Sequence, residues 1–228
     1  KLYLRNTALR ATELARSVKG GAKQMITIHH LNMSRSRRLL WLLEELDVPY
    51  EFIHYERDAV TRLAPPELMK VHPLGKAPVI TDGDVTLAES GAIIEYLVRK
   101  YGNGKLVPAD PFSKEGLAYL EFMHSAEGSV MLPLLLNLYV GRLGEAGAPL
   151  HPRITSEIAN QYRYLEGRLG DQPFLCGDQL TAADCQMLFA LEGMAMSGGL
   201  AAYPKLSAYV TRMQDRPAYK RAIDRGGW

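Results

Sequence analysis

The stretch HPLGKAPVITDGDVTLAESGAII, residues 72–94, decides the fold of this chain. Pro78 introduces a short apolar strand, and Asp82-Gly83 is typical of a hairpin turn into a second strand. Ser90 is expected to cap a helix, because a serine oxygen can accept hydrogen bonds from the unpaired amides of a first helical turn. Five apolar positions then repeat with helical spacing, namely Ile93, Ile94, Leu97, Val98 and Tyr101. The stretch therefore predicts a β-hairpin that leads directly into an amphipathic helix.

The segment upstream of this hairpin predicts a strand, a helix and a second strand. Residues 25–31 have strand composition, residues 32–35 form a loop, and residues 36–46 place their leucines on one helical face. A second strand is expected at 50–55, and a short helix begins at about residue 65 with proline in its first turn. A strand, helix, strand unit of this length implies parallel strands joined by a right-handed crossover. The predicted order is βαβα followed by ββα.

This order, together with the Lys76-Ala77-Pro78 and Glu89-Ser90 motifs, resembles the thioredoxin-like domain of cytosolic glutathione S-transferases. The resemblance covers residues 25 to about 225 and implies an α/β thioredoxin-like domain followed by an all-helical domain. It implies a cis bond before Pro78, main-chain pairing of Ala77 with the cysteinyl unit of glutathione, and a γ-glutamyl site at Glu89 and Ser90. Lys76 matches the partner of the glycyl carboxylate. The simpler interpretations are a solvated lysine at Lys76 and a helix cap at Ser90.

The loop between the first strand and the first helix carries no thiol. Residues 32–38 read NMSRSRR, where thioredoxin-type reductases carry Cys-x-x-Cys. Sulfur chemistry would therefore use the thiol of a bound ligand, and a hydrogen-bond donor near a helix N-terminus would stabilise its thiolate. The run from Ser34 resembles the fungal and bacterial transferases that carry serine here, which makes Ser34 the candidate catalytic residue. Two other residues stay open as donors, namely Asn32 and Ser36, although Ser36 also fits a helix cap. A further alternative is that no residue of this loop contacts the sulfur.

Arg35, Arg37 and Arg38 crowd the start of the predicted helix, where the helix dipole disfavours positive charge. An anionic neighbour is therefore expected. Glutathione is one candidate, and the other is a set of intramolecular ion pairs with Glu44, Glu45 or Asp84. Three arginines without interleaved aromatic residues do not make a nucleic-acid groove.

The second half of the chain predicts a separate helical domain. Breaker-rich residues 103–111 form a linker between a first domain at 25–102 and a second at 112–228. The expected elements are a helix over 112–143 that Pro133 kinks or divides, a loop over 144–152 and a helix over about 153–169. Thr181 and Asp184 then have the spacing of a capping box, as in the family's second domain. We expect Asp184 to stabilise the fold and to have no catalytic role.

The electrophilic substrate is expected to bind between the domains, against the first helix of the second domain. Candidate contacts at helical spacings are Tyr119, Phe122, Met123, His124, Glu127, Met131, Leu135 and Tyr139. Such a stripe of Met and aromatic residues is more often ordinary core. His124 and Glu127 could form an acid and base pair, although residues one turn apart usually make a packing contact. His29 and His30 are neighbours on a strand, so they point to opposite faces and cannot hold a metal together.

Composition narrows the functional class. The chain has 228 residues, 47% hydrophobic and 23% charged, and no apolar run approaches the about 18 residues of a membrane span. Its two cysteines, Cys176 and Cys185, have no disulfide, redox or metal-ligand spacing, so a reducing, cytoplasmic setting is expected. Residues 1–24 hold six Lys or Arg and one Glu, so they carry +5 and the remaining residues −3. Because Met25 reads as a natural start, we interpret 1–24 as an expression extension or misplaced start, with an organelle transit peptide second.

The resemblance implies a homodimeric glutathione S-transferase that takes part in detoxification. Such an enzyme activates the thiol of glutathione for attack on a hydrophobic electrophilic small molecule or a peroxide. No metal, nucleotide, nucleic acid or membrane enters this interpretation. Two alternatives use the same scaffold, a glutathione-dependent disulfide or peroxide reductase and a noncatalytic binding module.

Overall fold

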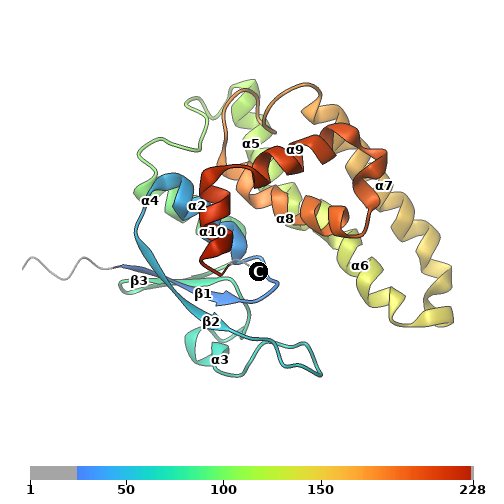
Figure 1. Cartoon of the computed structure of the whole chain (residues 1–228), viewed down its shortest axis with the longest axis horizontal. Helices are drawn as coiled ribbons and strands as arrows, with labels where there is room; N and C mark the ends of the chain where they lie inside the picture. The colour runs from blue at the N-terminus through green and yellow to red at the C-terminus, as the bar shows by residue number, and fades with distance from the viewer. Residues whose placement is uncertain (1–24, 227–228) are drawn as a thin grey trace, which may run out of the picture.

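The computed structural model describes residues 25–226, so the predicted leader at 1–24 lies outside the described residues. A four-stranded sheet with three helices forms one part of the molecule, and helices alone form the other (Figure 1). The strands are β1 (Ile26–Leu31), β2 (Tyr50–Tyr55), β3 (Val79–Asp82) and β4 (Val85–Ala88). The predicted strand at 50–55 is confirmed, and the strand predicted at 25–31 begins one residue later than expected.

The sheet has the strand order β2-β1-β3-β4. β1 pairs with β2 in parallel, as the crossover requires, and β3 pairs antiparallel with both β1 and β4. The helices of this part are α2 (Arg37–Leu46), α3 (Leu68–Val71) and α4 (Ser90–Tyr101). In Figure 1, α2 and α4 lie on the side of the sheet that faces the helical part, and α3 lies on the other side. The predicted order βαβα followed by ββα is confirmed.

The helical part contains six α-helices and three short π or 3₁₀ segments within the described residues. In chain order they are α5 (Lys114–Ser125), a π-helical segment (Ala126–Val130), α6 (Met131–Gly141), a 3₁₀ segment (Gly144–Leu150), α7 (His151–Leu169), α8 (Ala182–Met196), a 3₁₀ segment (Gly199–Ala202), α9 (Pro204–Gln214) and α10 (Pro217–Asp224). No helix among residues 25–226 is both long enough and apolar enough to cross a membrane.

One prediction for this part was wrong in detail. The long helix is interrupted by the π-helical segment Ala126–Val130, and Pro133 lies in the first turn of α6, directly after that segment. The predicted loop at 144–152 is a 3₁₀ segment that runs into α7, which begins at His151. Pro152 fits there because the first helical turn needs no N–H from it.

The predicted capping box is present at the start of α8. The buried carboxylate of Asp184 accepts hydrogen bonds from the N–H of Thr181 at 2.8 Å and from its hydroxyl at 3.0 Å. It also accepts from the N–H of Leu175 at 3.0 Å and the hydroxyl of Tyr209 at 2.8 Å. Asp184 therefore joins the loop before α8 to α9, which supports its structural role.

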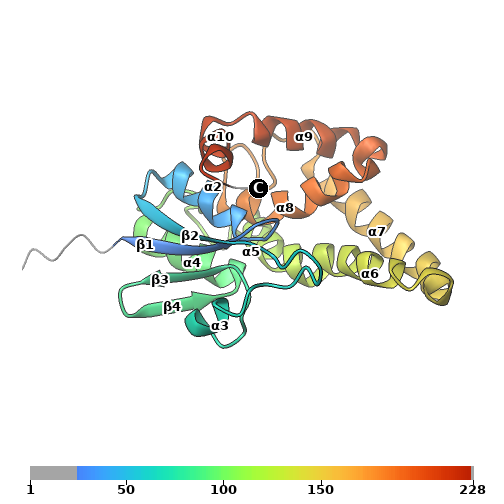
Figure 2. The same ribbon diagram turned by 60° about the horizontal axis from the view of Figure 1, so that its bottom comes forward.

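The last helix returns to the first domain. α10 lies beside α2 in both views of the molecule (Figures 1 and 2). Glu44 of α2 pairs with Arg221 and Arg225, and Glu45 pairs with Arg216. The prediction that these two carboxylates neutralise the arginines at the start of α2 was therefore wrong, because residues about 170 positions later in the chain occupy them.

Candidate functional site

A cavity of about 620 Å³ opens where the two parts of the molecule meet. Its wall from the first domain includes all five residues predicted to bind glutathione, namely Lys76, Ala77, Pro78, Glu89 and Ser90. The facing wall includes Glu127, Leu135 and Tyr139 from the second domain, and Arg35 and Arg57 extend the first-domain side. The structure therefore brings together residues that two separate motifs contributed.

The two motifs meet because β3 and β4 form a hairpin. The peptide bond between Ala77 and Pro78 is cis, as the resemblance implied. Ala77 precedes β3, and Glu89 follows β4, so the hairpin places both at one end of the sheet. Glu89 has a φ of 71°, a left-handed conformation that turns the chain sharply into α4.

Ser90 does not cap α4, contrary to the prediction. Glu89 occupies the cap position and Ser90 is the first helical residue. The Ser90 hydroxyl instead accepts hydrogen bonds from Nη1 of Arg38 at 2.9 Å and from Nε2 of Gln186 in α8 at 3.3 Å. A serine hydroxyl has two acceptor positions and one hydrogen, so these contacts leave the hydrogen to donate to a ligand. Both domains thus orient Ser90 as a donor.

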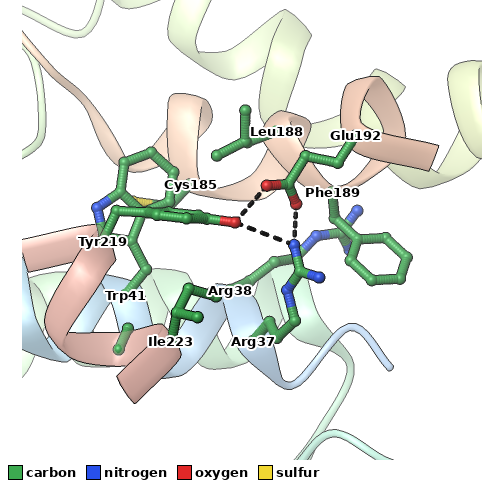
Figure 3. Close-up of a pocket in the computed structure, with 10 residues that line it drawn as sticks. Arg37, Arg38, Trp41, Cys185, Leu188, Phe189, Glu192, Tyr219 and Ile223 are labelled. Carbon is green, nitrogen blue, oxygen red and sulfur yellow. Dashed lines mark hydrogen bonds and ion pairs between the residues drawn. The ribbon is translucent and has the colours of Figure 1, made fainter. Parts of the chain in front are cut away.

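The three arginines of the 35–38 segment bind two carboxylates of the second domain. Arg35 donates from Nε to both oxygens of Glu127 at 2.8 Å, and Arg38 donates from Nη1 to the same carboxylate at 2.5 Å. Arg37 donates from Nη2 to the carboxylate of Glu192 and, at 3.3 Å, to the hydroxyl of Tyr219 (Figure 3). Intramolecular pairs were expected, but with other partners.

Burial and ion pairing act against each other at these charges. Burial lowers the pKa of Arg38 to about 10, although the neighbouring Glu127 opposes that shift. Burial alone would raise the pKa of Glu127, but its contacts with Arg38 and Arg35 hold that pKa below its usual value. Both groups therefore stay charged at neutral pH.

The loop that was expected to activate the thiol turns its polar side chains inward. The Oγ atoms of Ser34 and Ser36 are 2.6 Å apart, and Ser36 Oγ lies 2.8 Å from Nδ1 of the buried His30. Asn32 accepts from the N–H of Arg57 at 3.0 Å. None of these three candidates lines the cavity, whereas the neighbouring Arg35 does. Ser36 holds the cap position of α2, but its side chain makes no cap hydrogen bond, because it contacts His30 instead.

A second, apolar cavity of about 330 Å³ adjoins the first and shares Leu135 with it. Its apolar lining comes from the loop before α2, from α6 and from α8. These residues are Met33, Met131, Leu134, Leu135, Leu138, Phe189 and Met196. Among the predicted substrate contacts, Met131 and Leu135 lie here. The α8 residues were missed, because nothing in the sequence relates α8 to the helix after the linker.

Other predicted contacts lie elsewhere. Tyr119, Phe122 and Met123 belong to the buried core. His124 is exposed and Glu127 pairs with arginines, so the acid and base pair suggested for them is not formed. His29 contacts Tyr55 and His30 contacts Ser36, and residues 25–226 contain no cluster of metal ligands.

Sequence profiles of known families match both parts of the chain. The glutathione S-transferase N-terminal domain matches residues 23–99, and the glutathione S-transferase C-terminal domain matches residues 128–217. The chain belongs to the glutathione S-transferase family. Glutathione S-transferase 3 of Schizosaccharomyces pombe is 37% identical over 221 residues, covering 88% of each chain. Glutathione S-transferase 1 of Saccharomyces cerevisiae is 31% identical, covering 86% of this chain and 92% of the relative.

Solved structures agree with the family assignment. A glutathione S-transferase from Actinobacillus pleuropneumoniae superposes with a TM-score of 0.81 at 32% identity, over 88% of this chain and 92% of that one. A homologue from Sulfitobacter, solved with bound glutathione, shares the fold with a TM-score of 0.77 at 20% identity, over 90% of this chain and 100% of that one. The predicted fold class is confirmed. The serine-type subclass, the domain boundaries and the site residues stay predictions.

Proposed function

We propose that this chain is a glutathione transferase that binds glutathione in the 620 Å³ cavity and activates its thiol for attack on an electrophile in the adjoining apolar cavity. One observation carries the proposal. The predicted main-chain, acid and hydroxyl contacts line one cavity, and Ser90 is oriented there as a free donor by Arg38 and Gln186. A peroxide is a second acceptor of the same thiolate.

The assignment of contacts follows the chemistry of glutathione. Glu89 takes the γ-glutamyl ammonium, and Ser90 at the N-terminus of α4 takes the carboxylate, where the helix dipole favours an anion. The main chain of Ala77 pairs with the cysteinyl unit, and Lys76 takes the glycyl carboxylate. The thiol then lies near the loop before α2. Lowering its pKa by two units requires about 2.7 kcal/mol, which one charge-assisted hydrogen bond and a helix dipole can supply.

Ser34 remains the proposed hydroxyl donor to the thiolate. Ser34 is 4% exposed, and its Oγ lies 2.6 Å from Oγ of Ser36, so its hydroxyl would have to leave this contact, or act through it, when glutathione binds. Ser34→Ala tests this role. An unchanged rate with unchanged glutathione affinity would remove Ser34 from the mechanism.

The second substrate is a hydrophobic electrophile of small size. Methionine and leucine side chains dominate the second cavity, and they adapt to varied apolar shapes. We also propose a homodimer in the cytoplasm. Both cysteines are free and buried, which suits a reducing compartment.

The two cysteines are poor redox thiols, so a disulfide or peroxide reductase on this scaffold would depend on the thiol of glutathione. Burial raises the pKa of Cys176 to about 12 and that of Cys185 well above its usual value, so neither forms a thiolate readily. The close relatives named as transferases favour the transferase over the reductase and the binding module.

Calorimetric titration with glutathione tests the proposal, followed by a conjugation assay with a chromogenic electrophile. We expect Ser90→Ala to weaken glutathione binding by about 10- to 100-fold, since it removes one hydrogen bond to a charged group. Ser207→Ala, at an exposed serine of α9, is the matched control and should bind like the wild type. A wild-type chain that does not bind glutathione at millimolar concentration would overturn the proposal.

A further inference from the structure

Arg35, Arg37 and Arg38 differ in burial and in which of their guanidinium nitrogens make hydrogen bonds. Arg37 is 8% exposed and is held by Glu192 and Tyr219, on the side of α2 that meets α8 and α10 (Figure 3). Arg38 is 2% exposed and donates to Ser90 and Glu127. Neither guanidinium is placed to meet a ligand inside the 620 Å³ cavity, and neither residue lines it.

Arg35 is different, because only its Nε is used. That atom donates to both oxygens of Glu127 at 2.8 Å. Within residues 25–226, neither terminal nitrogen of Arg35 makes a hydrogen bond. The side chain is 27% exposed and lines the cavity together with Ala77 and Ser90. Arg35 therefore lines the cavity with a side chain whose four terminal N–H groups no protein hydrogen bond uses.

The orientation of Arg35 is set by the second domain. Glu127 holds its Nε, and the ring centre of Phe189 lies 5.9 Å from its guanidinium carbon. Phe189 also contacts the guanidinium groups of Arg37 and Arg38, at 5.7 and 5.2 Å. Arg35 and Arg38 share the single carboxylate of Glu127, so that carboxylate does not balance both of their charges.

We propose that Arg35 is a catalytic residue, whose terminal nitrogens face the sulfur of glutathione and stabilise its thiolate, with Glu127 as the positioning residue. The thiol proton leaves to solvent. The thiolate sulfur then forms a bond to an electrophilic carbon, and the leaving group departs to solvent with the electron pair of the bond that breaks. This inference rests on the proposed function and replaces Ser34 as the main source of stabilisation. A positive charge within about 4 to 6 Å lowers the pKa of an acid by about 1 to 3, whereas the Ser34 hydroxyl is already engaged by Ser36.

The test measures the pKa of bound glutathione from the ultraviolet absorbance of its thiolate, in wild type and variants. Arg35→Gln removes the charge but keeps a donor for Glu127, so it should fold. We expect it to raise the thiol pKa by about 1 to 2 and to lower kcat/KM at neutral pH by about 10- to 100-fold, with most of the rate recovered at alkaline pH. Arg35→Lys should recover part of the effect, since it restores the charge without the planar fork.

Arg153→Met is the matched control, because Arg153 pairs with Glu157 on the surface of α7, and its side chain is 77% exposed. It should leave the thiol pKa unchanged. An Arg35→Gln protein that binds glutathione with an unchanged thiol pKa would overturn the inference, as would a Ser34→Ala protein that shows the full rise instead. A wild type that binds no glutathione, or binds it without any lowering of the thiol pKa, would contradict the proposed function itself.

Discussion

Asp184→Asn tests whether the cap of α8 is structural. The two oxygens of Asp184 each accept two hydrogen bonds, one from a main-chain N–H and one from a hydroxyl. Whichever way the asparagine turns, its amide NH₂ faces the N–H of Leu175 or of Thr181, so one buried main-chain donor is left unpaired. An unpaired buried donor costs about 1 to 3 kcal/mol, and the displaced hydroxyl adds a smaller amount. We expect the free energy of unfolding to fall by about 2 to 4 kcal/mol.

Urea denaturation at one fixed protein concentration measures this loss, since the midpoint should fall while the slope stays constant. Thr181→Ser is the control, because it keeps a hydroxyl near Asp184 and should stay within about 1 kcal/mol of wild type. Glutathione affinity at low temperature should be unchanged in both variants. A loss below about 1 kcal/mol in Asp184→Asn, or a loss of activity without a loss of stability, would refute the structural assignment.

Three further variants test the rest of the site. Gly193 lines the apolar cavity, and a Cβ there would meet no atom within 4 Å, so Gly193→Leu should fill the cavity and raise KM for bulky electrophiles while glutathione affinity stays constant. The Glu127 pKa is lowered in the fold, so its stabilisation is present above the unfolded value of about 4.3 and is lost as pH falls through the folded value. As pH is lowered, the free energy of unfolding of Glu127→Gln should therefore fall less than that of the wild type, as measured by fluorescence in acid titrations. Tyr219→Phe removes the hydroxyl contacts to Glu192 and Arg37 and should lower unfolding free energy by about 1 to 2 kcal/mol in urea.

Local sequence patterns were sufficient for the first domain. The turn at Asp82-Gly83, the strand at Tyr50–Tyr55 and the helix after Glu89 follow from periodicity and turn chemistry among neighbouring residues, and the structure has them where expected. The resemblance placed the Ala77-Pro78 and Glu89-Ser90 motifs at one site, and the hairpin that joins them brings both to one end of the sheet. These predictions needed no knowledge of the second domain.

The side-chain partners could not be predicted in the same way. Ser36 and Ser90 both have the residue type of a cap, but His30 and the distant Gln186 take their hydroxyls. Arg37 pairs with Glu192, 155 residues later, where sequence proximity suggested the carboxylates of α2. A side-chain hydrogen bond that caps a helix contributes about 1 kcal/mol to stability. Leaving a buried charge without its opposite charge costs more than that, so the ion pairs decide where the side chains lie. Long-range pairing therefore overrode the local patterns at the site.

Because of these long-range pairs, both domains build the proposed glutathione site. Arg38 is 2% exposed, and a buried guanidinium left unpaired would be strongly destabilising. Its partner Glu127 lies in the π-helical segment between α5 and α6, and Gln186 lies in α8, so Ser90 is held in its donor orientation only when both helices are docked. The same Glu127 holds Arg35 at the cavity. In the proposed mechanism, binding of glutathione and activation of its thiol would therefore be coupled through one carboxylate, and packing of the two domains would be a condition for both.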